Sequence, residues 1–505
     1  MGKGAGFFVS IVAVATAALA FGSVDVQAQT LRVSNIGNPP NHGDPTTSLS
    51  YQHSYTFEAM FDALTTVDGD GSVKGRLATS WKNVDPTTWR FTLAPGVSFH
   101  AGAPFNADAI VAAVKQLQSD DQKKFGGSVY GSLKHIVDAK KIDDLTVDVI
   151  TERPAPILPH EIAAFRVIDP KAWADLGREK FGNSPSGTGP FRATSWDDTK
   201  AEMTRFDQGV RKAKFDGILM YFQPEAATRV QAFQGDAVDL VFGIPTGSAG
   251  LIRQAGGTVN EGTTPSVSIL VFNMNKGGIT ADKRVRQAFN YAIDKSYPET
   301  LFNGFGKAGS QPASASVNGY QPDIKPYPYD PTKARALLAE AGYGSGLTVD
   351  AEIVNNNADL TNLYQQVAQD LKKVGVTMNL KIITLPDLFG RVVGSKEFEG
   401  QMHIMNYGSN PSNDVMRSLN AFHSCTARAK WTCLPDAEEA IKGANTEFDP
   451  VKRAADLRKI AEVYHDEAPV IFLYEQFELD ATSKKVKNYK NENWRINWAD
   501  IEMVK

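Results

Sequence analysis

Residues 330–382 read DPTKARALLAEAGYGSGLTVDAEIVNNNADLTNLYQQVAQDLKKVGVTMNLKI, and the period of their apolar positions changes three times. From 330 to 342 the spacing is helical, with Asp330 as N-cap, Pro331 at the first helical position and Gly342 as the stop. Positions 347–353 alternate like a strand, 360–374 return to helical spacing, and 376–382 alternate again. This succession predicts a mixed α/β lobe with parallel strand pairing.

Outward from this stretch, helical spacing also marks 285–293 and about 450–467, whereas short strands and turns dominate from about 145 to 270. The 505 residues are too many for one ordinary core, since a domain typically holds ~100–200. We therefore expect two lobes, of which the first carries an inserted subdomain.

Composition excludes several classes of protein. The formal net charge is −4, which gives no electrostatic footprint for nucleic acid or for an anionic membrane. A mean hydropathy of −0.28 argues against a protein with many membrane spans. Two cysteines are too few for a disulfide-dense scaffold or a cysteine-based zinc cluster.

The first 28 residues have the pattern of a secretory signal peptide. Lys3 precedes an uncharged run from 7 to 20, and Val26-Gln27-Ala28 places short residues before a cut. The alternative, a membrane anchor, needs ~20 apolar residues, more than this run contains. No cysteine lies near the cut, so we expect a periplasmic protein released by cleavage and not a lipoprotein.

Seven residues lie between Cys425 and Cys433. In an oxidising compartment two cysteines this close form a small disulfide loop, and two free thiols are the alternative.

Catalytic motifs are missing from the sequence. It contains no G-x-S-x-G, no H-E-x-x-H and no P-loop, and no two of its eight histidines have the i, i+4 spacing of metal ligands on a helix. We predict no enzyme, no cofactor and no metal site. A secreted hydrolase, with a triad assembled from distant residues, is the competing function class.

Several motifs resemble the peptide/nickel family, family 5, of periplasmic solute-binding proteins of ABC importers. They run in order along nearly the whole mature chain: LATSW at 77–81, WRFTL at 89–93, GVSFH at 96–100, GAPFNAD at 102–108, SGTGPF at 186–191, VQAFQGDAVD at 230–239, DKRVRQAFNYAID at 282–294, the helix at 330–342 and LKKVGV at 371–376.

The resemblance implies an α/β, two-lobed periplasmic binding protein fold, type II, of the large cluster C class. Lobe 1 would comprise 29–267 plus 475–505, with the inserted subdomain at about 50–170, and lobe 2 would comprise 268–474. Two crossing strands would join the lobes, which would close on a ligand. The expected partners are a small-molecule ligand and ABC permease subunits, with no nucleic acid, and we expect a monomer. A chaperone-like binder of unfolded chains is a further alternative.

The resemblance breaks at two ligand-binding positions. Peptide binders of the family hold the ligand's amino terminus with an Asp, and the matching loop here has Tyr407 at the aromatic position and Asn410 at the Asp position. Dipeptide binders of the family have an Arg that binds the ligand carboxylate. At the matching position this chain has no Arg and reads Val354 followed by three asparagines. Asp414 would replace the lost carboxylate if the loop is rearranged. An amide cannot neutralise a buried ammonium, so both departures weaken the simple dipeptide prediction.

Asparagine offers both a donor and an acceptor, which suits neutral hydroxyl-rich or amide-rich ligands. We therefore expect a polar solute: a peptide or peptide-like conjugate, with a sugar, an opine-like conjugate or a metal chelate as alternatives. His403 and His423 flank the loop and are the residues on which the chelate alternative rests. The asparagines at 355–357 also fit a simple turn. The candidate ligand-binding residues are Asn38, His42, Asn273, Asn355, Asn356, Tyr407, Gly408, Asn410 and Asp414.

Overall fold

The computed structural model describes residues 1–2, 29–354, 358–392, 397–427 and 431–504. The predicted signal peptide therefore lies outside the described residues, except for its first two. Within the described ranges, no helix is long and apolar enough to cross a membrane.

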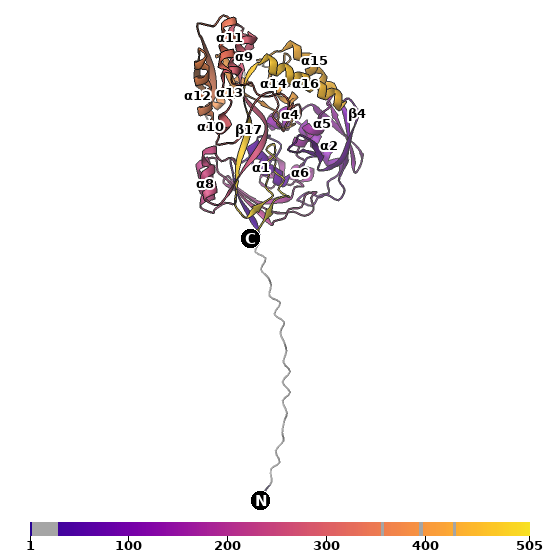
Figure 1. Ribbon diagram of the computed structural model, residues 1–505. Helices are drawn as coiled ribbons and strands as arrows, with labels where there is room; N and C mark the ends of the chain where they lie inside the picture. The colour runs from indigo at the N-terminus through magenta and orange to yellow at the C-terminus, as the bar shows by residue number, and fades with distance from the viewer. Residues whose placement is uncertain (3–28, 355–357, 393–396, 428–430, 505) are drawn as a thin grey trace.

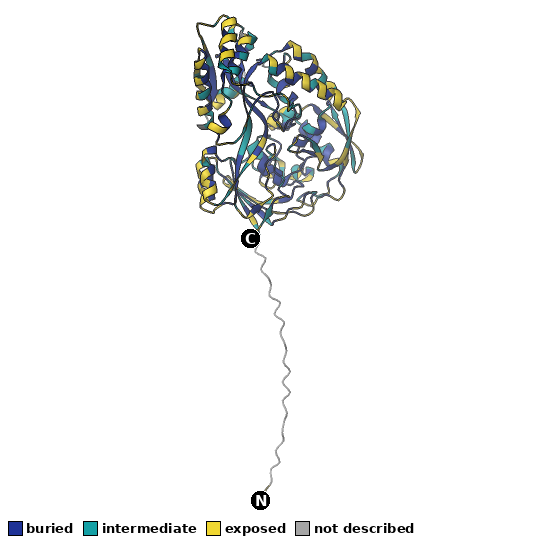
Figure 2. Cartoon of the chain, viewed as in Figure 1, coloured by how far each residue is buried: buried dark blue, intermediate teal, exposed yellow. Residues whose placement is uncertain are grey.

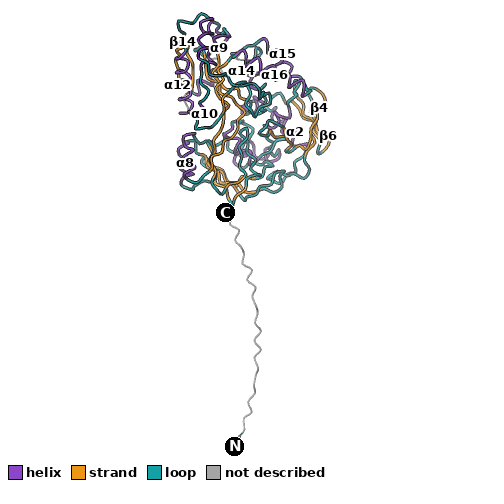
Figure 3. Tube along the Cα trace, in the orientation of Figure 1, coloured by secondary structure: helices purple, strands orange, loops and turns teal. Residues whose placement is uncertain are grey.

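An 11-stranded mixed sheet organises most of the molecule, and its strands run through the middle of the trace in Figure 3. β14 pairs with β15 in parallel, as the strand–helix–strand pattern of 330–382 predicts. Toward the other end of the sheet β1 pairs in parallel with β10. The strands in spatial order are β15 (Val376–Ile383), β14 (Leu347–Val354), β16 (Met402–Gly408), β12 (Thr258–Phe272), β17 (Val470–Thr482), β11 (Leu240–Val241), β1 (Thr30–Asn35), β10 (Gly217–Phe222), β9 (Lys200–Arg205) and β8 (Phe191–Trp196), with β13 (Lys307–Ala308) paired to β17.

Two long antiparallel strands, β12 and β17, join the two ends of this sheet. Thr258 pairs with Thr482 beside β11, and Val271 pairs with Val470 beside β16. Their register shifts between Thr263 and Val267, around Pro265, whose ring nitrogen cannot donate to the ladder. Figure 1 shows β17 running from the group of α9, α11 and α12 toward the group that contains α1 and α8.

At the β15 end of the sheet, helices begin where capping residues stand in the sequence. The Asp330 carboxylate accepts from the Lys333 backbone N–H at the start of α11, and Asp449 caps α16 in the same way. The apolar faces of α9, α11 and α12 pack on β14 and β15 in one core. The helices of this end are α9 (Lys283–Ala292), α10 (Tyr297–Thr300), α11 (Pro331–Glu340), α12 (Ala358–Lys373), α13 (Leu385–Val392), α14 (Met416–Phe422), α15 (Pro435–Thr446) and α16 (Pro450–Glu467).

The β8 end of the sheet has a separate core, which α1 and the chain's last segment complete. Trp498 is fully buried there, and its indole N–H donates to the Tyr55 carbonyl. The C-terminal segment therefore returns to the end of the sheet at which the chain began. The elements of this end are α1 (Tyr51–Met60), β2 (Thr65–Val67), β3 (Val73–Gly75), α6 (Pro170–Asn183), α7 (Ala226–Gln234), α8 (Ala249–Gln254), β18 (Val486–Lys487) and β19 (Glu502–Met503).

A four-stranded antiparallel sheet forms a third unit, at the right of Figure 1. Its core contains Phe91 and Phe105, with Trp81 and Trp89 packed against it, so these aromatic residues of the family motifs are structural. The strands in order are β4 (Ala78–Asp85), β5 (Thr88–Leu93), β7 (Thr146–Thr151) and β6 (Ile136–Asp143), with the helices α2 (Ala107–Leu117), α3 (Asp120–Phe125), α4 (Gly127–Leu133) and α5 (Leu158–Glu161). Figure 2 shows the exposed outer faces of the peripheral helices around the buried strands.

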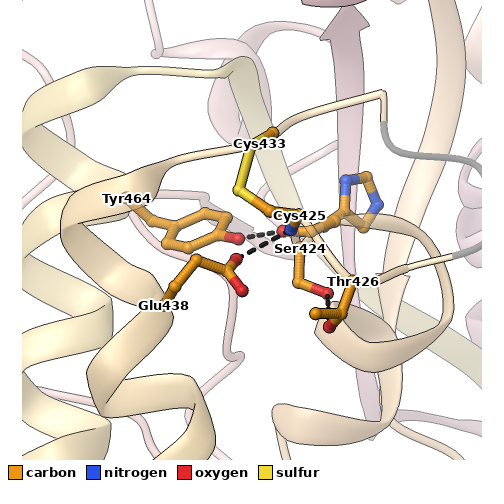
Figure 4. The surroundings of a disulfide bond; sticks show 7 residues. Ser424, Cys425, Thr426, Cys433, Glu438 and Tyr464 are labelled. Atoms are coloured by element: carbon orange, nitrogen blue, oxygen red, sulfur yellow. Dashed lines mark hydrogen bonds between the residues drawn. A yellow bond between two sulfur atoms is a disulfide. The ribbon is translucent and has the colours of Figure 1, made fainter.

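Cys425 and Cys433 form a disulfide with an S–S distance of 2.01 Å between α14 and α15 (Figure 4). The Cys425 backbone N–H donates to Glu438 of α15 at 2.7 Å, and the Tyr464 hydroxyl donates to the His423 carbonyl. The disulfide is thus part of a contact that ties the end of α14 to α15 and α16.

Candidate ligand-binding cleft

A cleft of 450 Å³ opens where β17 passes between the two ends of the large sheet. Its volume falls in the ~300–1,000 Å³ range typical of small-molecule sites. A larger groove of 710 Å³ is lined only from the β8 end and the C-terminal segment, so no element from the β15 end faces it. The cleft is lined by Ile36, Tyr51, Ala226, Arg229, Gly243, Ile244 and Pro245 from the β8 end, by Phe302, Asp359 and Leu360 from the β15 end, and by Tyr474, Phe477, Glu478 and Leu479 of β17.

The first wall stands at the carboxyl ends of two parallel strands, β1 and β11. Ligands of open α/β sheets bind at this edge because the connecting loops there are free to line a crevice. Arg229 holds these loops: its guanidinium donates to the carbonyls of Phe242 at 2.9 Å and Gly243 at 2.6 Å, and to those of Gln223 and Pro224. Four of its donors are thus engaged with backbone, so Arg229 shapes the wall.

Gly243 is required by the close approach of its neighbours. Its φ is +63°, and a Cβ there would lie 2.6 Å from Ile36 Cδ1 and 2.8 Å from Glu478 Oε1. The glycine therefore allows the loop after β11 to pack closely against β17, which forms the floor of the cleft.

The second wall meets the first through a direct hydrogen bond. The Thr246 hydroxyl donates to Asp359 Oδ2 at 3.0 Å, which links the loop after β11 to the first turn of α12. Phe302 packs on Tyr474 and Phe477, at ring centroids 5.0 and 5.6 Å apart. Residues from both ends of the sheet thus meet over the floor of the cleft.

Two acidic side chains, Glu478 and Asp480, project from the same face of β17, since they are two residues apart on a strand. Asp480 accepts hydrogen bonds from the Tyr489 hydroxyl (2.7 Å), the Asn491 amide (2.8 Å) and the Gly243 N–H (3.0 Å). Burial raises the pKa of the Glu478 carboxyl to about 8, and the charge of Asp480 adds to this shift. Burial also raises the pKa of Asp480, but its hydrogen bonds from Asn491, Tyr489 and Gly243 oppose that shift.

A stacked aromatic pair continues the cleft on its β8 side. Tyr51 and Trp494 lie with ring centroids 4.9 Å apart and an interplanar angle of 20°. Trp494 also lines a small neighbouring cavity together with Asn410. The cleft therefore combines flat apolar surfaces with one weakly compensated carboxyl group, a combination suited to a polar solute with an apolar portion.

The structure separates the predicted loop residues. Tyr407 is fully buried, with its ring against His423 and Tyr464. Asp414 is also fully buried, and Arg453 donates to it at 2.8 and 3.1 Å. Asn318 donates to the same carboxylate at 2.8 Å, so Asp414 is engaged with protein partners and does not stand in for the lost ligand-binding Asp in this structure.

Gly408 and Asn410 reach the boundary between the two ends of the sheet. Gly408 ends β16 opposite Ser266 of β12. The Asn410 amide donates to the Leu49 carbonyl at 3.0 Å, a contact that spans 361 residues of sequence. Asn410 precedes a cis peptide bond to Pro411, and the pair lines the small cavity beside Trp494.

The remaining predicted site residues lie elsewhere. Asn38 accepts from the Trp196 indole at 3.1 Å, and His42 pairs with Asn183 and Asp198 on the outer edge of the sheet. Asn273 is buried at the end of β12 and donates to the Gly400 carbonyl at 2.6 Å. Asn355 and Asn356 lie outside the described residues.

The two histidines of the chelate alternative are core residues. The His403 ring stacks on Phe398 at 3.8 Å between centroids, and His423 is fully buried beside Thr432. Among the residues that the structure describes, no group of three or more His, Cys, Asp or Glu side chains is placed to hold a metal ion.

Sequence reasoning missed Tyr51, Glu478 and Trp494. The sequence does contain an indication for Glu478, because Glu475, Glu478 and Asp480 interrupt an otherwise apolar and aromatic stretch at 470–482. A charged residue inside a buried strand is unusual and is often functional. Tyr51 and Trp494 are 443 positions apart, and no local pattern links them.

The fold and the cleft define a two-lobed α/β binding protein, and comparison with known proteins identifies the family. The model of the bacterial extracellular solute-binding proteins, family 5 Middle, matches residues 72–430. The chain belongs to this family, whose members serve ABC transporters. The predicted family and fold class are therefore confirmed.

Two curated relatives and one solved structure illustrate the similarity. The chain is 27% identical to the dipeptide-binding protein of Escherichia coli K12, over 95% of this chain and 94% of that protein. It is 27% identical to the glutathione-binding protein GsiB of Pectobacterium atrosepticum, over 86% of each. The periplasmic binding protein DppA from Helicobacter pylori, solved in complex with the peptide STSA, superposes with a TM-score of 0.74 at 20% identity, over 94% of this chain and 98% of that one.

Proposed function

We propose that this protein is an exported receptor that binds one peptide-like solute carrying an amine in the cleft around Glu478 and delivers it to an ABC permease. The observation that carries the proposal is the half-buried Glu478 carboxyl, with its pKa raised to about 8, in a cleft lined from both ends of the sheet. An ammonium beside it would neutralise the carboxylate and offset the cost of its burial. Glu478 would thereby supply the negative charge that Asn410 lacks.

The relatives support a solute of this class. The two relatives are named for binding a dipeptide and glutathione, and both compounds combine an amine with peptide bonds. The stacked Tyr51 and Trp494 rings and Phe477 offer apolar faces for the rest of such a solute.

Binding by hinge closure is part of the proposal. We assign 29–267 plus 475–505 to lobe 1, with 50–170 as its inserted subdomain, and 268–474 to lobe 2. The long strands β12 and β17 then form the hinge, and the Thr246–Asp359 and Asn410–Leu49 hydrogen bonds are contacts made on closure.

Export and delivery complete the proposal. Cleavage of the signal peptide after residue 28 would release a periplasmic monomer, with the disulfide oxidised there. The closed form would dock on permease subunits, and the change from open to closed would report that solute is bound.

The direct test is mass spectrometry of whatever co-purifies with the protein from the periplasm. We expect one amine-bearing, peptide-like compound per chain. Calorimetry with that compound and with its N-acetylated form should show at least tenfold weaker binding of the acetylated form. An amine-free solute at one per chain would overturn the proposal, as would equal affinity for the two forms.

A matched pair of variants localises the interaction. Glu478→Gln should lose the preference for the free amine, whereas Glu502→Gln, at an exposed residue paired with Lys214, should keep it. If the Glu478 variant retains the preference, the amine is bound elsewhere in the protein.

A further inference from the structure

Four arginines cluster beneath the boundary between the two ends of the sheet, around only two carboxylates. Arg211 donates to Asp62 at 2.7 Å, and Arg76 lies 3.5 Å from the same carboxylate. Arg166 lies 3.4 Å from Glu58, which Arg76 also approaches, at 3.8 Å. The fourth, Arg495, comes from the C-terminal segment. Four guanidinium groups and two carboxylates leave an excess of two positive charges in this cluster.

These charges act on one another through a protein interior that screens them weakly. Burial lowers the pKa of Arg495 to about 10. The charges of Arg166 and Arg76 lower this pKa further, whereas the charge of Glu58 raises it. Burial and the charge of Arg166 also lower the pKa of His53 to about 4. A buried cationic excess of this kind is costly unless an anion compensates it.

Several donors of the cluster have no acceptor. Arg166 is 9% exposed, and its Nη2 is bonded to Ser54 and Glu58, but its Nε and Nη1 meet no acceptor among the described residues. The same holds for Arg495 Nε, although its Nη1 and Nη2 donate to the carbonyls of Ala163 and Pro411. Arg166 and Arg495 both line a cavity of 10 Å³ beside Asn410 and Pro411. Glu58 lines it as well, and its carboxylate already accepts from Arg166 Nη2.

We propose that this cavity is a binding site for a monoanion, held between Arg166 and Arg495 at the contact of the 410–411 loop with the β8 end of the sheet. Guanidinium N–H groups prefer anionic oxygen and halide acceptors, and the unpaired donors of the cluster would then be engaged. The site has room for about one water-sized group, which suits one carboxylate oxygen or a small halide. A polyanion such as phosphate is too large.

The anion can come from two sources, a free inorganic ion or a carboxylate of the bound solute. Trp494 lines this cavity and stacks on Tyr51 of the cleft, so the two sites share a wall. In either case the anion would lie between Arg166 and Arg495 of one lobe and the Asn410–Pro411 loop of the other, and would favour the closed form. This inference does not depend on Glu478 or on an amine in the solute.

The test uses the whole mature protein and two probes, sodium bromide and sodium formate, with sodium isethionate at matched ionic strength as a bulky-anion reference. Crystals in bromide should give an anomalous peak between Arg166 and Arg495. The thermal midpoint should rise with probe concentration beyond the isethionate reference. Bromide binding assigns the site to inorganic anions, whereas formate binding without bromide binding assigns it to a carboxylate.

Variants separate the site from general salt effects. Arg495→Gln should weaken probe binding at least tenfold, and Arg166→Lys, which keeps the charge but loses the fork, should weaken it as well. The control Arg458→Gln changes an exposed arginine paired with Asp323 and should leave binding unchanged. If neither bromide nor formate stabilises the wild-type protein beyond isethionate, or if bromide stabilises it but no bromide peak lies between Arg166 and Arg495, the proposal is wrong, and this outcome does not depend on whether the variants fold.

Discussion

At the scale of single residues, two acids on one face of β17 have opposite roles. Burial raises the pKa of both carboxyl groups, but Asp480 is held by three hydrogen-bond donors, whereas Glu478 faces the cleft with its pKa raised to about 8. Asp480 accepts from the Gly243 N–H and so joins the strand at the floor of the cleft to the wall. Glu478 is therefore a half-buried acid that a cationic solute group would stabilise.

The folded state should become less stable as Glu478 ionises. Its pKa in the folded state lies above the ordinary value of 4.5 for a glutamate, so the unfolded chain loses this proton first, and stability falls as pH rises from about 4.5 to 8. Glu478→Gln should remove this slope and stabilise the solute-free protein by about 2–4 kcal/mol at pH 8 relative to pH 5. Urea unfolding at the two pH values measures it, and an unchanged slope would show that Glu478 is ionised across the range.

Gly243→Ala should destabilise the protein by about 1–3 kcal/mol, because its Cβ would collide with Ile36 and Glu478 at a positive φ. It should also weaken solute binding, because the wall must move into the cleft. The control is Gly250→Ala in α8, where a Cβ would meet nothing within 4 Å and a helical alanine is favoured. Equal thermal midpoints for the two variants would contradict this account.

At the scale of elements, the 330–382 pattern predicts α11, β14, α12 and β15, because capping residues and a regular apolar period act locally. The cleft is different, since its residues come from segments up to 443 positions apart, and their meeting depends on strand order. Asp414 illustrates the limit: its sequence context shows a carboxylate in a loop, but not that Arg453 occupies it.

Removing the disulfide between α14 and α15 should lower the stability of the fold but leave solute affinity nearly unchanged. Replacing Cys425 and Cys433 together by Ser should lower the free energy of unfolding by about 2–3 kcal/mol, the loop-closure value for a ring of this size. Solute affinity should be retained, because neither cysteine lines the cleft. Chemical denaturation and calorimetry on the same preparation measure both; a lost affinity would place this segment in the binding site.

At the scale of the whole molecule, β12 and β17 connect two parts that otherwise meet through side chains such as Thr246 with Asp359 and Asn410 with Leu49. Contacts of this kind are weak individually, since each hydrogen bond contributes ~0.5–1.5 kcal/mol. Under the proposed hinge closure, bound solute would hold the two parts together.

Saturation with the co-purified solute should therefore reduce the radius of gyration measured by small-angle X-ray scattering. The solute-free sample is prepared by unfolding and refolding, which removes the compound. Identical scattering with and without solute would contradict closure by a hinge.

The central claim is that Glu478 pairs with a cationic group of the solute. Glu478 is mostly protonated at pH 7, so pairing must expel its proton. Titration calorimetry of the co-purified solute at pH 7, in buffers of different ionisation enthalpy, should show nearly one proton released per solute bound, and none for Glu478→Gln. No proton release by the wild-type protein, with unchanged affinity in the variant, would contradict the account.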